Sequence, residues 1–174
     1  MENQSVSRKG PFRKAMSELK ASPDCLDALR REHHADCAVC APSNRLGLRL
    51  RCRLHEDGSV KASFRANRFM QGYDGWLHGG VIAALLDGAM TNCLFAHGCR
   101  APTAELRVRY RQPVLLANPL QVIARIVNAA PPLYVVSAEI QQDGEVRARA
   151  TGKFVGNENG RARKANPSFA GPAR

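Results

Sequence analysis

The residues best suited to chemistry lie in one apolar stretch of this 174-residue chain, between positions 77 and 95. The stretch opens with His78-Gly79-Gly80 and afterwards carries a single charge, that of Asp87. An unpaired carboxylate inside a core costs several kcal/mol, so a chain that keeps one there usually uses it. Asp87 is therefore a candidate catalytic group. The alternative interpretation is a structural carboxylate that hydrogen-bonds the backbone or pairs with an arginine.

The glycine pair at the start of this stretch could bind an anion. If a helix begins here, its first amides lack intrahelical partners and lie at the positive end of the helix dipole. Glycines leave room for an acyl carbonyl or a phosphate to approach those amides, which makes an anion or oxyanion site. His78 fits a role in shaping the loop better than proton transfer, because the motif holds no carboxylate to complete a triad with it.

The spacing of these groups bears on the oligomeric state. Gly79 and Asp87 are eight residues apart, which is about 12 Å along a helix axis. A carbonyl held at the Gly79 amide is thus out of reach of Asp87 in the same chain. If both groups act on one substrate, the carboxylate must come from a second, antiparallel copy of the helix. On that condition, the spacing predicts an obligate dimer with a composite site.

Length and apolar composition predict one helix of roughly four turns for the stretch itself. Large apolar residues repeat at helical spacing along it, namely Ile82, Leu85, Leu86, Ala89 and Cys93. The opposite side is also apolar or small, and a helix without a polar face is expected to be buried on all sides. Gly80, Ala84 and Gly88 form a ridge of small residues where another backbone could approach.

Segments with strand-like alternation flank this helix on both sides in the chain. They cover residues 46–54, 59–64, 103–111, 120–130, 133–142 and 145–155. Turn signals at 56–58 and 143–144 indicate hairpins. Two strands, a buried helix and four strands predict an α+β domain whose antiparallel sheet curls around the helix.

Three regions follow from composition. We expect a helical and flexible N-terminal extension over 1–44, a folded domain over 45–156 and a basic disordered tail over 157–174. Within the extension, Ser22 or Asp24 could cap a helix that runs to Arg31. Glycines at 72 and 75 mark 67–76 as a loop, whose aromatic residues we expect over the mouth of the site: Phe69, Tyr73 and Trp76.

The net charge of +11 is divided between the tails and the strands. Arginines that alternate along a strand are most often its solvated face. The alternative is that this positive charge binds a polyanion, either coenzyme A or nucleic acid. No run of 18 apolar residues and no signal-type N-terminus is found, so we expect no membrane span and a cytoplasmic protein with reduced cysteines.

Residues 33–40 bring two histidines and a Cys37-x-x-Cys40 pair together. Such ligands can bind zinc. However, no second ligand pair follows at zinc-finger spacing, and Cys40-Ala41-Pro42 offers no supporting knuckle. We therefore interpret the segment as a structural turn into the first strand and predict no metal.

The His-Gly-Gly motif, Asp87 and the segment 103–113 together resemble the PaaI-like acyl-CoA thioesterases of phenylacetate degradation, which belong to the 4-hydroxybenzoyl-CoA thioesterase superfamily. The resemblance covers roughly residues 37–155. It implies the hotdog fold, with about six strands wrapped around one long helix, and assembly at least as a dimer, with a tetramer as the alternative. It also implies hydrolysis of an acyl-CoA substrate with no cofactor.

The resemblance gives roles to individual residues. Asp87 would act as general base or attack the carbonyl, and the partner's Gly79 amide would donate to the oxyanion. Thr103 stands where similar enzymes carry a hydroxyl near the carboxylate. Several relatives place an Asn or Gln shortly before the His-Gly-Gly, where Gln71 is close but offset by one from Gly72.

Other contacts are inferred from position in the chain. Thr91 lies one helical turn beyond Asp87 and could hold a water molecule, and Gly80 adjoins the anion site. The surface arginines picked for the phosphates of coenzyme A are Arg68, Arg100 and Arg109.

Two other functions compete with hydrolysis. One is a non-catalytic acyl-CoA-binding sensor or regulatory module that contacts DNA through its basic N-terminal helices. The retained Asp87, and a segment 12–33 that is too short and proline-broken for a helix-turn-helix, disfavour this function and nucleic acid as a partner. The other is a hydratase, whose Asp/His arrangement is not found in the sequence.

Overall fold

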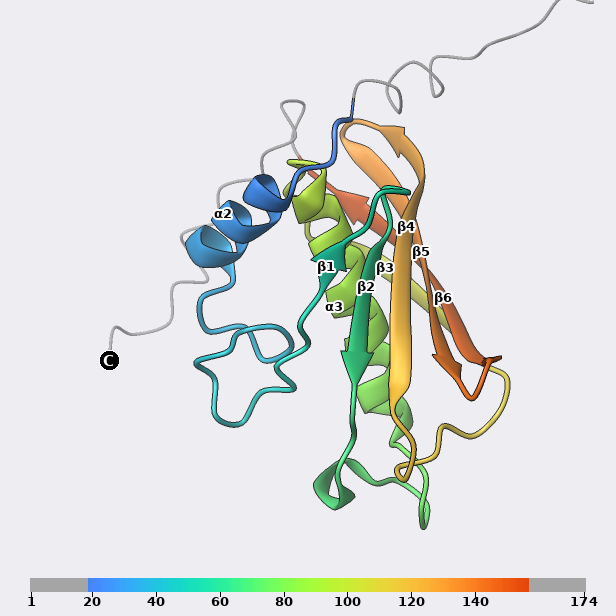
Figure 1. The fold of residues 1–174 in the computed structure, drawn as a ribbon. Helices are drawn as coiled ribbons and strands as arrows, with labels where there is room; N and C mark the ends of the chain where they lie inside the picture. The colour runs from blue at the N-terminus through green and yellow to red at the C-terminus, as the bar shows by residue number, and fades with distance from the viewer. Residues whose placement is uncertain (1–18, 157–174) are drawn as a thin grey trace, which may run out of the picture.

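The computed structural model describes residues 19–156, which form one antiparallel sheet with a long helix lying against it (Figure 1). The elements are α2 (Pro23–His33), β1 (Arg53–Leu54), β2 (Val60–Phe64), the short 3₁₀ helix η1 (Arg68–Met70), α3 (Gly79–Ala96), β3 (Thr103–Tyr110), β4 (Leu120–Ala130), β5 (Leu133–Gln142) and β6 (Glu145–Val155). Within the described residues the sheet has six strands in the order β1-β2-β4-β5-β6-β3. The predicted α+β architecture, that of a hotdog fold, is confirmed.

The central helix α3 follows the predicted stretch closely. The His78 imidazole caps it by accepting a hydrogen bond from the Gly80 amide, and the chain leaves it at His97. Gly98 then adopts φ +70°, the left-handed conformation that commonly ends helices. By length and hydropathy α3 could cross a membrane, but its burial against the sheet accounts for that composition.

The expectation that α3 is buried on all sides is wrong for a single chain. One stripe of the helix stays open: Gly80 is exposed, whereas Ala84, Asp87 and Thr91 are half-buried. The sheet covers the large apolar side, and α2 with the segment after it covers another part, as Figure 1 shows. Gly80 and Ala84 lack such a cover among residues 19–156, whereas Gly88, the third residue of the predicted small-residue ridge, is buried beneath Val39.

The predicted strand over 46–54 is also wrong, apart from its last two residues. Arg49 has φ 53°, and Leu46 is 98 % exposed, so the alternation of leucines does not make one buried face. The amides of Leu48 and Leu50 instead bond the carbonyls of Ala38 and Val39. The backbone is therefore satisfied by a neighbouring loop, and regular pairing with β2 begins only at β1.

The remaining strands agree with the sequence to within one residue at each end. In the N-terminal region, Ser22 accepts from the Asp24 amide and caps α2, whose Leu26 is buried. The expected disorder of 157–174 and of the first residues lies outside the described part of the chain. The domain boundary at residue 44 stays a prediction.

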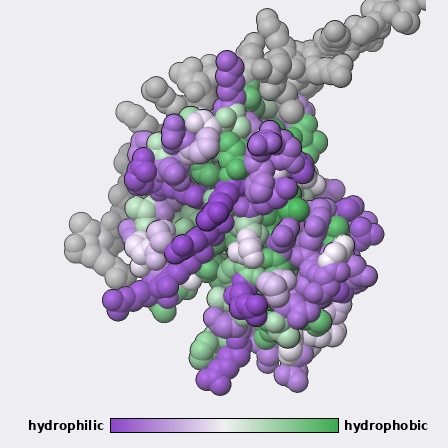
Figure 2. Space-filling view, viewed as in Figure 1, coloured by the Kyte–Doolittle hydropathy of each residue, from purple (hydrophilic) through white to green (hydrophobic). Residues whose placement is uncertain are grey.

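The arginines of the strands lie mainly on solvated faces. Arg107, Arg109 and Arg111 are all exposed. In the view of Figure 2, hydrophilic side chains cover most of the visible face, and hydrophobic surface shows in patches between them.

Candidate active site

Asp87 lies on the open stripe of α3, next to the start of the edge strand β3. The Thr103 hydroxyl donates a hydrogen bond to Asp87 Oδ1 at 2.7 Å. Both residues line a cavity of about 390 Å³ together with Thr91 and Arg100. A hydroxyl donor at Oδ1 orients the carboxylate and leaves Oδ2 available to another ligand, and the cavity has room for a water molecule or a carbonyl group beside it.

Two further side chains shape this cavity. The Thr91 hydroxyl donates to the Asp87 carbonyl at 3.1 Å, so its oxygen can still accept a hydrogen bond from a ligand. His34 also lines the cavity, and burial, reinforced by the neighbouring His33, lowers its pKa. Arg100, which also lines this cavity, brings a permanent positive charge to it.

The start of α3 lines a second, separate cavity of about 490 Å³. Gly79 and His78 lie in its wall with Tyr110 and Trp76, and none of these residues borders the cavity of Asp87. Within residues 19–156 the Gly79 amide donates no hydrogen bond, as expected for the first residue of a helix. Its carbonyl accepts from the Tyr110 hydroxyl at 3.0 Å.

The role of His78 is structural in this geometry. Its Nδ1 accepts from the Gly80 amide at 2.9 Å, so the neutral ring carries its proton on Nε2. A Cβ on Gly72 would lie 3.1 Å from the His78 Cα, so glycine at position 72 permits this close approach. The loop and the cap thus fix the start of α3, and Gly79 lies in the wall of the cavity there.

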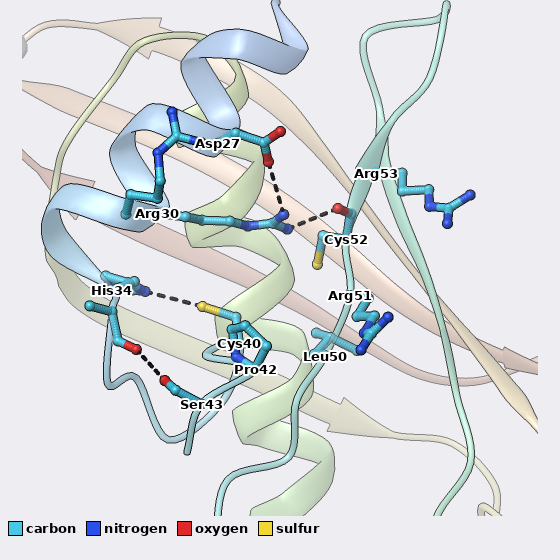
Figure 3. Close-up of a pocket in the computed structure, with 12 residues that line it drawn as sticks. Asp27, Arg30, His34, Cys40, Pro42, Ser43, Leu50, Arg51, Cys52 and Arg53 are labelled. Carbon is cyan, nitrogen blue, oxygen red and sulfur yellow. Dashed lines mark hydrogen bonds and ion pairs between the residues drawn. The ribbon is translucent and has the colours of Figure 1, made fainter. Parts of the chain in front are cut away.

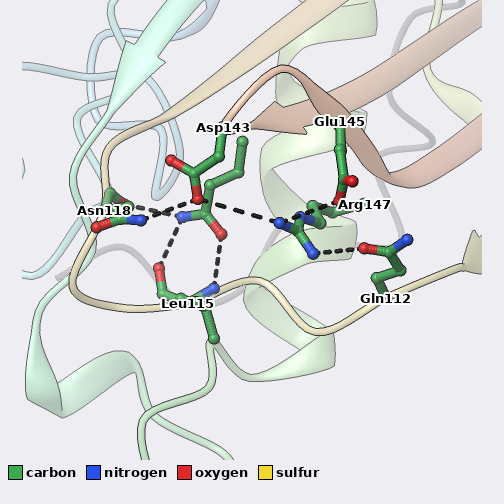
Figure 4. A network of polar contacts seen from close by, with 7 residues as sticks. Gln112, Leu115, Asn118, Asp143, Glu145 and Arg147 are labelled. Carbon is green, nitrogen blue, oxygen red and sulfur yellow. Dashed lines mark hydrogen bonds and ion pairs between the residues drawn. The ribbon is translucent and has the colours of Figure 1, made fainter.

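A buried glutamine that sequence reasoning missed supports this end of the helix. Gln142, at the end of β5, is 2 % exposed; it donates to the carbonyls of Leu115 and Asn118 and accepts from the Leu115 amide. Figure 4 shows Leu115 and Asn118 on the loop that these bonds hold. The next residue before Leu115, Val114, accepts from the Leu77 amide. Gln142 thereby holds the loop that positions the helix entry. No local sequence signal distinguishes it, because the loop that it binds is distant in the chain.

The remaining predicted site residues are placed apart from these cavities. Gln71 accepts from the Gly75 amide through Oε1, so it closes its own loop. Arg68 stacks on Phe69 at 4.9 Å, and neither borders the two cavities. Arg109 is exposed on β3, opposite Arg149 of β6. Of the three predicted arginines, only Arg100 lines a cavity with a candidate catalytic group.

Asp87, Gly79 and Thr103 all lie in a segment that matches a known protein family. Residues 74–148 match the family model described as "Thioesterase superfamily". Over these residues the chain is similar to that superfamily, and we call this segment the thioesterase domain.

Relatives of the thioesterase domain carry further information. Over 94 residues the chain is 30 % identical to the acyl-coenzyme A thioesterase THEM4 of Rattus norvegicus, a match that covers 53 % of this chain and 40 % of that protein. The chain thus spans less than half the length of this curated relative.

Solved structures with the same fold superpose on most of the chain. The crystal structure of a thioesterase superfamily protein superposes with a TM-score of 0.67 at 24 % identity, and covers 86 % of each chain. A phenylacetic acid degradation-related protein from Ralstonia eutropha JMP134 superposes with a TM-score of 0.59 at 24 % identity, over 67 % of this chain and 91 % of that one.

Among the aromatic residues expected at the mouth of the site, two line the cavity at the helix entry. Tyr73 and Trp76 meet edge to face, with ring centroids 5.9 Å apart, and both border the Gly79 cavity of the thioesterase domain. Phe69 is 84 % exposed and lies outside it.

Proposed function

We propose that this protein hydrolyses the thioester of an acyl-coenzyme A to a free acid and coenzyme A. One observation carries the proposal. The Asp87 carboxylate borders one cavity, and Gly79, whose amide donates no hydrogen bond among residues 19–156, borders a second cavity nearer the start of the same helix. The open stripe of α3 lies between the two. The family match and the name of the rat relative support this reaction class.

We further propose that two copies complete each site. The open stripe of α3 and the outer edge of β3 adjoin each other through the Asp87–Thr103 hydrogen bond. An edge strand with free backbone groups and a helix side of small residues can both accept another copy of the chain. An antiparallel α3 from the partner would cover the roughly 12 Å that separate the two groups in one chain.

The proposed chemistry uses an amide donor and a carboxylate. The partner's Gly79 amide would polarise the thioester carbonyl and hold the developing oxyanion. Asp87 would either take a proton from the attacking water or attack the carbonyl carbon itself, and both roles need an ionised carboxylate. The carbon–sulfur bond then breaks, and the coenzyme A thiolate leaves and takes up a proton. Attack by water gives the free acid directly, whereas attack by Asp87 gives an acyl–Asp87 anhydride that a water molecule then hydrolyses to the free acid and the Asp87 carboxylate. The Arg100 guanidinium is the nearest candidate for a phosphate or carbonyl contact beside Asp87.

Hydrolysis of a panel of acyl-CoA thioesters, followed by detection of the released thiol, tests the function. We expect Asp87→Asn and Asp87→Ala to lower kcat by about 100- to 10,000-fold, the range for an essential proton-transfer group. Asp24→Asn, which changes an exposed carboxylate on α2, serves as the matched control. A wild-type protein that binds acyl-CoA tightly without hydrolysing any member of the panel would instead be a sensor module.

A further inference from the structure

Three metal-binding side chains come together after α2, and one of them, His34, also lines the Asp87 cavity. His34, Cys37 and Cys40 each offer one ligand atom, and these atoms all lie within 4.8 Å of one another. The imidazole Nδ1 of His34 is 3.4 Å from Cys40 Sγ, and Figure 3 shows the two side chains directed at each other from α2 and the following loop. The sequence alone left this segment as a structural turn.

The three donors are held in place by their surroundings. The His34 ring packs edge-on against Phe95 of α3, with centroids 4.8 Å apart. Cys40 is 8 % exposed. The Val39 amide donates to Cys37 Sγ at 3.4 Å, which is the kind of amide–sulfur contact that supports thiolate ligands. The knuckle that the sequence seemed to lack is therefore provided by the backbone between the two cysteines.

The segment that carries these donors is long and irregular. Residues 34–52 contain no helix or strand, and a structureless connection of this length is uncommon unless something else orders it. It nevertheless packs closely on the central helix, since a Cβ on Gly88 would lie 2.4 Å from Val39 Cγ1. Gly88 is the residue next to Asp87, so the order of this segment affects the helix at the candidate site.

We propose that His34, Cys37 and Cys40 bind one Zn²⁺ ion, or a cation of similar softness, that clips this segment to the end of α2. Zinc takes sulfur at about 2.3 Å and nitrogen at about 2.0 Å, which places tetrahedral donors about 3.5–3.8 Å apart. The observed group needs only small side-chain shifts to reach that geometry. A mixed thiolate and imidazole set selects zinc over the hard cations Mg²⁺ and Ca²⁺.

The fourth ligand position opens toward solvent in this arrangement. His34 and Cys40 both border a cavity of about 760 Å³, which also has Arg30, Arg51 and Cys52 in its wall (Figure 3). Water from this cavity is the fourth ligand that we infer. The ion would contact neither Asp87 nor Gly79, and its proposed effect is on the order of the segment. It would adjoin the candidate site through His34, which also lines the Asp87 cavity.

Metal binding by the whole chain, purified under reducing and metal-free conditions, tests this site. We expect one Zn²⁺ per chain in competition with a chromophoric chelator. Co²⁺ should give the visible absorption of a tetrahedral site and the ultraviolet charge-transfer band of thiolate ligands. Cys37→Ser, Cys40→Ser and His34→Gln should each weaken zinc binding by at least ~100-fold, since loss of a second-shell partner alone costs up to this much.

Matched variants keep the test independent of folding. Cys25→Ser and His33→Gln change a neighbouring cysteine and histidine outside the cluster and should bind zinc as the wild type does. Because Cys37 is half-buried, Cys37→Ser should stay folded by circular dichroism even if the buried Cys40→Ser does not. Zinc should slow hydrogen exchange at the Leu48 and Leu50 amides in the wild type and not in Cys37→Ser.

Three results would overturn the proposal. One is zinc binding that is equal in the wild type and Cys37→Ser. Another is a cobalt spectrum without thiolate charge transfer. The last is formation of a Cys37–Cys40 disulfide in zinc-containing buffer. The proposal instead expects both cysteines to stay reduced and to be protected from alkylation by the bound metal.

Discussion

The hydroxyl of Thr103, the first residue of β3, donates a 2.7 Å hydrogen bond to the Asp87 carboxylate on α3. This bond joins the edge strand to the central helix at the one charged position of an otherwise apolar element. It also determines which carboxylate oxygen stays available to a ligand. In the proposed reaction Thr103 is therefore a positioning residue.

Substitution of Thr103 tests this role. Thr103→Val keeps the shape and removes the donor, and we expect a loss of about 10- to 100-fold in kcat, corresponding to a hydrogen bond to a charged group. Thr103→Ser restores the donor and should recover most of the activity. KM should change little in both variants. Equal activity of the valine and serine variants would show that the hydroxyl does not orient Asp87.

The Gly79 amide can be removed without breaking the helix. Proline is favoured at the first helical position, and His78 already has the extended conformation (φ −61°, ψ 135°) that a residue before proline requires. We expect Gly79→Pro to lower kcat by about 100- to 1,000-fold, the usual effect of losing one oxyanion donor. Gly79→Ala keeps the amide, and its Cβ would meet Tyr110 at an ordinary 3.6 Å, so it should be far more active.

The proposed sharing of sites between protomers has its own test. A mixed dimer of Asp87→Ala and Gly79→Pro chains, purified through two different tags, contains one intact site and one doubly defective site. We expect about half of the wild-type activity from this dimer, although each parent homodimer is nearly inactive. A mixed dimer as inactive as its parents would place both groups of a site in the same chain.

The turn before β2 predicts a pH dependence of stability. Hydrogen bonds from Ser59 and Arg125 hold the pKa of Asp57 well below its ordinary value of 3.8. A carboxyl whose pKa is lower in the folded than in the unfolded state stabilises the folded protein at pH values above its unfolded pKa. This stabilisation is lost as the pH falls toward the folded pKa. Asp57→Asn should therefore unfold at a lower temperature than the wild type at pH 7, and the gap should close in acid.

The control for this prediction is Glu56→Gln, since the Glu56 carboxylate makes no ion pair or hydrogen bond among residues 19–156. A gap for Asp57→Asn that is the same at pH 7 and in acid would contradict the proposed ionic contribution.

Close packing of Val39 on Gly88 predicts a compensating pair of substitutions. An added Cβ at position 88 would lie 2.4 Å from Val39 Cγ1. Overpacking typically costs about 1–3 kcal/mol, which exceeds the gain of up to about 1 kcal/mol from alanine in a helix. Gly88→Ala should thus destabilise the wild type in urea unfolding. In a Val39→Ala background the same change should be neutral or stabilising, and a constant cost in both backgrounds would argue against the contact.

The alternation of apolar and polar residues predicted an element correctly wherever segments adjacent in the chain bury one face of that element. Strands β4, β5 and β6 form consecutive hairpins, and their predicted bounds agree with the structure. The segment 46–52 has the same alternation, yet its backbone bonds the loop at Ala38 and Val39. Periodicity cannot distinguish these outcomes, because it records which side chains are apolar and not which backbone is near enough to pair.

The sequence by itself determined the helix, its acid, its glycine-rich entry and the distance between them, since helical rise converts residue spacing into length. Only the tertiary structure decided what meets these groups. Thr103 at Asp87, Gln142 beneath the loop at Leu115 and Asn118, and Cys40 beside His34 all come from contacts between separate parts of the fold. Those contacts depend on how the sheet curls and how an irregular segment packs, which many residues determine jointly through close packing.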